Sequence, residues 1–128
     1  MDVFYARHVC RVTPQPEYVR RTFAAIARNP EVYYTMNGPS EFHVIGSLKT
    51  WDIIPRLGEI QVPALVTSGG HDEATPLIAG TVHEGIPSSR WVIFEESSHM
   101  PHAEEPERYM RVLDEFLTEV ESNAGARS

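Results

Sequence analysis

Residues 62–76 read Val-Pro-Ala-Leu-Val-Thr-Ser-Gly-Gly-His-Asp-Glu-Ala-Thr-Pro, and this stretch decides the fold. Its first part, residues 62–67, is a short apolar run that Ser68-Gly69-Gly70 closes. Such a run, ended by turn residues, is typical of a strand buried on both faces. Polar side chains follow at once, beginning with His71 and Asp72, as they do at the carboxyl end of a strand in a parallel sheet.

The same pattern repeats further along the chain. Thr75 and Pro76 fit the N-cap and first turn of a helix that we expect to end near Glu84. Residues 91–94 predict a second buried strand. Pro106 opens a last helix whose apolar residues recur at helical spacing: Tyr109, Val112, Leu113, Phe116, Leu117 and Val120.

The chain therefore divides into an α/β part and a helical part. Residues 61–121 read β-α-β-α, which implies parallel strands with helices on the faces of the sheet. Residues 1–60 are expected to form part of a separate helical cap, and residues 122–128 a flexible tail. Within the cap we expect a helix over 16–28, irregular structure over 31–50 and a short helix or turn over 51–60.

Composition narrows the class of protein. The 128 residues carry 18 acidic and 11 basic side chains, a formal net charge of -7, and this acidic balance argues against nucleic acid as a partner. Cys10 is the single cysteine, so no intramolecular disulfide can form. Residues 1–8 do not resemble a signal peptide and no apolar run reaches membrane-spanning length, so we expect a cytoplasmic protein without a membrane partner.

An acid and a histidine stand after the two predicted strands. Asp72 follows the first and His99 follows the second, and parallel strands bring their carboxyl ends to one edge of the sheet. The order, acid before histidine, is that of the second half of an α/β-hydrolase triad. An aspartate that accepts from one imidazole nitrogen leaves the other nitrogen to take a proton from a hydroxyl nucleophile. The pattern predicts that Asp72 and His99 are a catalytic pair.

Other interpretations of these residues stay open. Taken alone, Asp72 fits a turn or a helix cap, and His99 fits a loop histidine without a task. The printed sequence contains no Gly-x-Ser-x-Gly, so it has no recognisable nucleophilic serine. Cys10 is expected to be a small buried residue and not a nucleophile.

Metal binding is the competing chemistry. The possible ligands are His71, His99, His102, Glu104 and Glu105. Pro101 interrupts any helix that would align His99 with His102, and no His-Glu-x-x-His motif occurs in the sequence. We therefore expect no metal and no cofactor. Glu95, Glu96, Glu104, Glu105 and Glu107 are expected to lie on solvated faces.

Two further glutamates are candidates for binding. Glu73 lies beside the predicted acid, and Glu41 lies in the cap region next to a turn. A carboxylate in such a place suits a positively charged substrate group, although a solvated surface position is the more common fate of a glutamate.

Five separated motifs carry a family resemblance. In chain order they are Gly38-Pro39-Ser40-Glu41-Phe42, Leu48-Lys49-Thr50-Trp51-Asp52, Leu57-Gly58-Glu59-Ile60, Asp72-Glu73-Ala74-Thr75-Pro76 and Glu95-Glu96-Ser97-Ser98-His99-Met100-Pro101. They resemble the proline iminopeptidases, α/β-hydrolase serine peptidases that remove an N-terminal residue, typically proline, from peptides. The resemblance runs from about Phe4 to Glu121 and is limited to the carboxyl-terminal part of the family.

The resemblance implies a fold and four roles. The chain would be the carboxyl-terminal β-α-β-α portion of an α/β-hydrolase, preceded by part of the helical cap. Asp72 would be the triad acid and His99 the triad base. Glu41 and Glu73 would hold the free amino group of a peptide substrate, which explains exopeptidase specificity.

The departures from the family lead to two hypotheses. The His-Gly-Gly-Pro-Gly and Gly-x-Ser-x-Gly of the family's amino-terminal half are missing, and His71 stands where an aromatic residue is expected. The first hypothesis is an enzyme part that acts with an amino-terminal half supplied by another chain. The alternative is a non-catalytic remnant, or a module that binds peptides or a protein partner. In either case a bare strand edge at residues 62–67 predicts self-association.

Overall fold

The computed structural model describes residues 2–125 and divides the chain into two compact units. The first unit joins the residues up to Thr13 to those from Ile54 onward, and the second comprises Pro14–Ile53. The first unit contains the sheet, and the second is helical.

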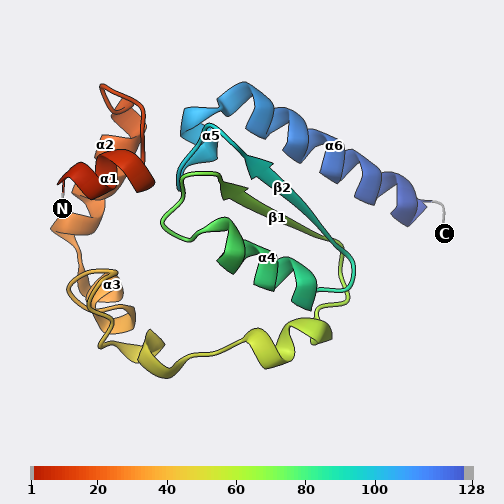
Figure 1. The fold of residues 1–128 in the computed structure, drawn as a ribbon, viewed down its shortest axis with the longest axis horizontal. Coiled ribbons are helices and arrows are strands. Elements are labelled where there is room, and N and C mark those ends of the chain that lie inside the picture. The colour runs from red at the N-terminus through yellow and green to blue at the C-terminus, as the bar shows by residue number, and fades with distance from the viewer. Residues whose placement is uncertain (1, 126–128) are drawn as a thin grey trace. The chain divides into compact units, whose positions relative to one another are not determined.

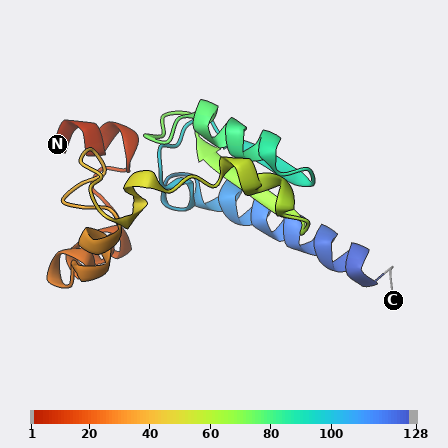
Figure 2. The ribbon, with the colours of Figure 1, turned by 90° about the horizontal axis from the view of Figure 1, so that it is seen from below.

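The first unit is built on two parallel strands. Strand β1 (Ala64–Gly69) pairs with β2 (Ser89–Phe94) in a register that runs from Ala64 opposite Ser89 to Gly69 opposite Phe94. Helix α4 (Pro76–Gly85) connects the strands, and α6 (Pro106–Gly125) follows them. Both strands lie between α4 and α6 in two perpendicular views (Figures 1 and 2). The predicted β-α-β-α order is confirmed.

The expected burial of the first strand is wrong. Ala64 to Thr67 are only half-buried, and full burial is limited to Ser68 and Gly69 at the carboxyl end. The reason is that β1 pairs with β2 along one edge, and no other strand of residues 2–125 pairs with its second edge. A strand in the middle of a larger sheet would be covered on that side as well.

Helix α4 begins and ends where local chemistry dictates. Thr75 takes the N-cap position and Pro76 the first turn, as predicted. At the other end, a Cβ on Gly85 would lie 2.7 Å from Cβ of Leu57, so any larger residue there would force the 3-10 helix η2 (Ile54–Glu59) to shift. The buried apolar residues of the first unit are Val9, Cys10, Leu57, Ile86, Phe94, Ala103 and Val112.

Helix α6 follows the short helix α5 (Pro101–Glu104) and packs on the end of β2. The ring centroids of Phe94 and Tyr109 are 5.6 Å apart, and the Arg108 guanidinium lies 4.8 Å from the centre of the Phe94 ring. The helix continues to Gly125, so residues 122–125 of the expected tail are helical, and residues 126–128 lie outside the described residues.

The remaining helices precede the sheet in sequence. Helix α1 (Asp2–His8) opens the first unit, and the second unit contains α2 (Glu17–Arg28), α3 (Glu31–Met36) and the 3-10 helix η1 (Ser47–Thr50). The expectation of irregular structure is wrong for α3, which starts after Pro30 and buries none of its residues. Such a helix has no apolar periodicity for a sequence to show. No helix in the described range is both long and apolar enough to cross a membrane.

Candidate active site

The loops that follow the two strands continue the pairing of the sheet. The backbone N–H of Gly70 donates to the carbonyl of Phe94 at 2.8 Å, and that of His71 donates to the carbonyl of Ser97 at 3.0 Å. These bonds extend the ladder past the end of both strands. The two loops are therefore held side by side at the carboxyl edge of the sheet, where α/β folds place their functional groups.

Two glycines make this close approach possible. A Cβ on Gly69 would lie 2.0 Å from the carbonyl oxygen of Ser98, and a Cβ on Gly70 would lie 2.7 Å from that of Glu95. Both obstacles are backbone atoms, which cannot swing aside as the end of a flexible side chain can. The φ angles of both glycines lie outside the left-handed region. The turn after β1 therefore needs glycine for lack of space and not for backbone conformation.

Asp72 and His99 meet across the two loops. Asp72 Oδ1 lies 2.9 Å from His99 Nδ1. The Asp72 side chain is 7% exposed, whereas that of His99 is 48% exposed. An ionised carboxylate only accepts hydrogen bonds, so Nδ1 carries the hydrogen and Nε2 is the acceptor of the neutral ring. This arrangement can remove a proton from a hydroxyl group brought to Nε2.

The glutamates predicted to bind substrate lie in different units. Glu73 follows Asp72 directly; its backbone N–H donates to the carbonyl of His8 at 3.2 Å, and its Oε2 atom is shielded from solvent. Glu41 lies in the second unit, half-buried, and accepts a hydrogen bond from the Tyr33 hydroxyl at 2.8 Å. The structure thus groups Asp72, Glu73 and His99, with Glu41 held by its own neighbours.

Sequence reasoning missed the buried partners of the histidine loop. Ser97 and Ser98 are fully buried, and their hydroxyls donate to Glu105 at 2.5 Å and to Glu104 at 2.7 Å. The prediction that these two glutamates lie on a solvated face is therefore wrong. The available signal was the pair of serines just before His99, since buried hydroxyls require acceptors nearby.

Glu105 is ionised more readily than an ordinary glutamate. Burial raises its pKa, but hydrogen bonds from Ser97 and Arg108 lower the pKa by more, so that the net shift is downward. The Arg108 guanidinium bridges Glu105, at 3.1 Å, to the carbonyl of Ile93 in β2, at 2.9 Å. The start of α6 is thereby tied to the strand that leads to His99.

The described residues do not support a metal site. No group of three or more histidine, cysteine or acidic side chains comes together among residues 2–125. The centroid of the His102 ring lies 6.0 Å from that of the Tyr109 ring. Cys10 is buried as expected, and burial, with the nearby charge of Glu104, raises the pKa of its thiol despite a backbone hydrogen bond that lowers it.

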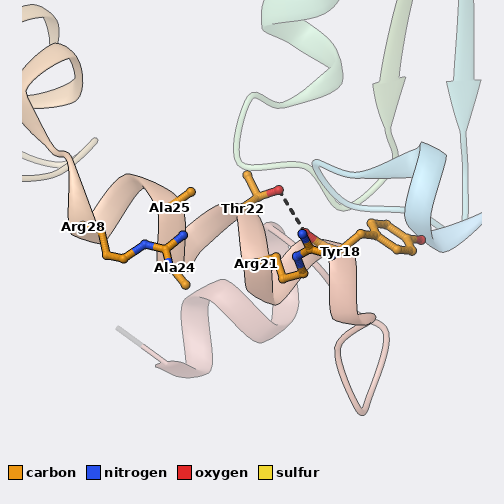
Figure 3. A pocket seen from close by; sticks show the side chains of 6 residues that line it. All are labelled: Tyr18, Arg21, Thr22, Ala24, Ala25 and Arg28. Atoms are coloured by element: carbon orange, nitrogen blue, oxygen red, sulfur yellow. Dashed lines mark hydrogen bonds between the residues drawn. The ribbon is translucent and has the colours of Figure 1, made fainter.

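The second unit has a hollow of its own on its surface. It lies along α2 and has a volume of about 510 Å³. Figure 3 shows the side chains that line it, which are Tyr18, Arg21, Thr22, Ala24, Ala25 and Arg28. None of the predicted site residues borders it, and the Thr22 hydroxyl donates to the carbonyl of Tyr18 in the same helix at 3.0 Å.

Several curated proteins similar to this chain are named proline iminopeptidase. The proline iminopeptidase of Saccharolobus solfataricus is 44% identical over 122 residues, which is 95% of this chain and 39% of that protein. The crystal structure of the proline iminopeptidase of Mycobacterium smegmatis matches 96% of this chain and 41% of its own, with a TM-score of 0.91 and 43% identity. The chain corresponds to the carboxyl-terminal part of the proline iminopeptidases.

A further solved structure extends the comparison. The crystal structure of VinJ matches 94% of this chain and 40% of its own, with a TM-score of 0.88 and 48% identity. No protein-family model matches the chain. The chain spans about two fifths of the length of the proline iminopeptidases it matches. Its fold is accordingly the carboxyl-terminal portion of an α/β-hydrolase, as the resemblance implied.

Proposed function

We propose that this chain supplies the acid and the base of the catalytic triad of a serine aminopeptidase that releases N-terminal proline from peptides. The observation that carries the proposal is the 2.9 Å contact between Asp72 and His99, which stand 27 positions apart in sequence. The similarity to proline iminopeptidases over nearly the whole chain supports the reaction class.

The chemistry follows from the geometry of the pair. Asp72 fixes the imidazole with the hydrogen on Nδ1, so Nε2 of His99 takes the proton of the attacking serine and later gives it to the leaving amine. Asp72 stays ionised and stabilises the imidazolium formed between these steps. The printed sequence has no Gly-x-Ser-x-Gly, so we propose that a segment outside these 128 residues provides the serine and the oxyanion donors.

The proposed substrate is a peptide with a free, protonated N-terminus. Glu73 stands next to the triad acid, and Glu41 has its carboxylate oriented by Tyr33. We propose that these two carboxylates bind the substrate ammonium, because a charged amine leaving water needs charged acceptors. A peptide with a blocked N-terminus would then be rejected.

The proposed partner is the amino-terminal part of the same fold. Residues 61–121 would form the end of the catalytic core and residues 1–60 part of its cap. The edge of β1 opposite β2 would pair with a strand of the missing part, on the same or another polypeptide, and would self-associate in its absence. We place the assembled protein in the cytoplasm, with no nucleic-acid, membrane or cofactor partner.

A reassembly experiment tests the proposal. This chain would be co-expressed with the amino-terminal three fifths of the Mycobacterium smegmatis relative, and the purified complex tested on prolyl p-nitroanilide. We expect release of nitroaniline from this substrate and none from its N-acetylated form. A folded complex of the two parts that hydrolyses neither compound would contradict the enzyme function, and peptide binding without turnover would then favour the non-catalytic module.

A further inference from the structure

One carboxylate next to the histidine loop collects four hydrogen bonds. Glu104 Oε2 accepts from the backbone N–H of Ser98 at 2.8 Å and of Met100 at 3.2 Å. Glu104 Oε1 accepts from the Ser98 hydroxyl at 2.7 Å and from the backbone N–H of Arg11 at 2.7 Å. All four donors lie within the first unit, and each oxygen serves two of them.

The donors bracket the proposed catalytic base. Ser98 and Met100 are the residues on either side of His99, and the same Glu104 oxygen holds both backbone N–H groups. Fixing the two neighbouring peptide groups limits the directions in which the His99 Cα–Cβ bond can point. The His99 side chain is itself nearly half-exposed, so the surrounding packing does little to orient it.

The segment that carries the fourth donor also contacts the acid loop. Arg11 also donates from Nη1 to the carbonyl of Glu96 at 2.8 Å, on the histidine loop. Three residues earlier, His8 Nδ1 lies 2.8 Å from the carbonyl of His71, and the His8 carbonyl accepts from Glu73 N–H. Residues 8–11 therefore contact both loops of the site, and Glu104 is the point where this segment meets the histidine loop.

We propose that Glu104 is a positioning residue for His99: its carboxylate sets the loop so that Nδ1 meets Asp72. The proposal rests on the proposed function for its catalytic consequence, but its structural content stands apart from it. Four donors require four acceptor sites, which a carboxylate supplies. In Glu104→Gln the side chain would keep its shape, but its NH₂ group would face two of the donors. An NH₂ group cannot accept their hydrogen bonds, so the loop would no longer be held.

The first test reads the tautomer of His99 in this chain. Imidazole ¹⁵N spectra distinguish a ring protonated at Nδ1 from one protonated at Nε2. We expect the wild-type chain to show the Nδ1–H form, and Glu104→Gln to shift the ring toward a mixture while amide exchange at Ser98 and Met100 accelerates by about tenfold. A variant that is merely less stable would keep the wild-type tautomer in its folded state.

Control variants distinguish the positioning role of Glu104 from a general effect of removing a negative charge and from a loss of folding. Glu107→Gln removes an exposed carboxylate three residues further on and should leave the His99 spectrum unchanged. If Glu104→Gln does not fold, Glu104→Asp decides, because it keeps the charge on a side chain one methylene too short to reach all four donors. A folded Glu104 variant with the wild-type tautomer and wild-type exchange at Ser98 and Met100 would overturn the proposal.

The second test measures catalysis in the reassembled enzyme. Glu104→Gln should lower kcat for prolyl p-nitroanilide by on the order of 10- to 100-fold with KM nearly unchanged, because the base is displaced while the substrate contacts remain. A rise in KM at constant kcat would contradict the positioning role. If the wild-type assembly is inactive, the proposed function fails, and the tautomer measurement still decides the role of Glu104.

Discussion

Asp72 holds two donors with one oxygen atom. Its Oδ1 accepts from the backbone N–H of Ala74 at 2.8 Å and lies 2.9 Å from Nδ1 of His99. The first contact is the local turn that a single aspartate after a strand suggests, and the second is the contact that a triad requires. The two interpretations of Asp72 are therefore compatible, since the turn directs the carboxylate toward the histidine loop.

Replacing Asp72 should slow the chemical step without weakening substrate binding. In the reassembled enzyme, we expect Asp72→Asn to lower kcat by about 10³- to 10⁴-fold, because an amide no longer enforces the Nδ1–H tautomer. The KM for prolyl p-nitroanilide should change little. Asp114→Asn, an exposed position on α6, is the matched control, and equal rates for the two variants would contradict the role of Asp72.

Glu105 should give the chain an acid-sensitive stability. Its folded-state pKa lies below the ordinary value of 4.5, so its ionised form stabilises the fold above that pH. This contribution is lost as the pH falls through the lowered pKa of the folded state. Urea unfolding of wild type and Glu105→Gln, at pH values from about 3 to 6, should show a shallower loss of stability for the variant below pH 4.5. Parallel curves would contradict the assignment.

At the residue scale, the sequence could predict Asp72 and His99 but not Glu104 and Glu105. The acid and the histidine each follow an apolar run by a few residues, and parallel strands bring the carboxyl ends of the two runs together. Glu104 ends α5 and Glu105 directly precedes α6, and exposed acids are common near the start of a helix. Their true surroundings depend on the fold of the Ser97-Ser98 turn, and no local pattern shows which way that turn faces.

At the scale of elements, two loops joined by backbone hydrogen bonds carry the site. The pairing of Gly70 with Phe94 and of His71 with Ser97 continues the ladder of β1 and β2. Because these contacts are between backbones, they do not depend on the chemistry of the side chains. The distance between acid and base is thus controlled by the ends of the strands, and by the space that Gly69 leaves.

A methyl group at position 69 should damage the fold. Gly69→Ala would place its Cβ 2.0 Å from the carbonyl oxygen of Ser98, and we expect a loss of about 3 kcal/mol in the free energy of unfolding. Gly58→Ala is the control, since a Cβ there meets nothing within 4 Å, and its effect should stay within about 0.5 kcal/mol. Similar unfolding midpoints for both variants in urea would contradict the close approach.

Helices and strands with a strong apolar periodicity, or with a proline or capping residue at their start, could be predicted from the sequence. Others could not. Thr75-Pro76 and Pro106 mark helix starts that the structure confirms. Strand β1 begins at Ala64, two residues later than predicted, because the apolar run includes Val62 and Pro63 before pairing starts. Helix α3 escaped prediction because it buries no residue, and η2 has the short helical form expected within residues 51–60.

At the scale of the whole molecule, the sheet of the described residues differs from a complete α/β-hydrolase sheet at the second edge of β1, which pairs with no other strand of residues 2–125. The described residues hold a two-stranded sheet, whereas the solved relatives extend well beyond the matched region. Ala64 to Thr67 are half-buried, because one edge of β1 has no neighbouring strand among residues 2–125. The family resemblance could predict this open edge, because the family's amino-terminal motifs are missing from the printed sequence.

The open edge should make the chain associate with itself. We expect sedimentation velocity to show species larger than a monomer as concentration rises. Val62→Lys should reduce this association, because Val62 is 65% exposed just before β1 and a charge there opposes strand pairing. Leu77→Lys, at an 81% exposed position on α4, is the control. Suppression by the α4 variant alone would place the contact on that helix and contradict pairing through β1.

The most direct test of the central claim compares two histidines of the same loop region. His99 contacts Asp72, whereas His102 lies three residues away against Tyr109. In the reassembled protein, kcat/KM for prolyl p-nitroanilide should fall to background in His99→Ala, by about 10³-fold or more, and stay near wild type in His102→Ala. Retained activity in a folded His99→Ala assembly would contradict the assignment of His99 as the catalytic base.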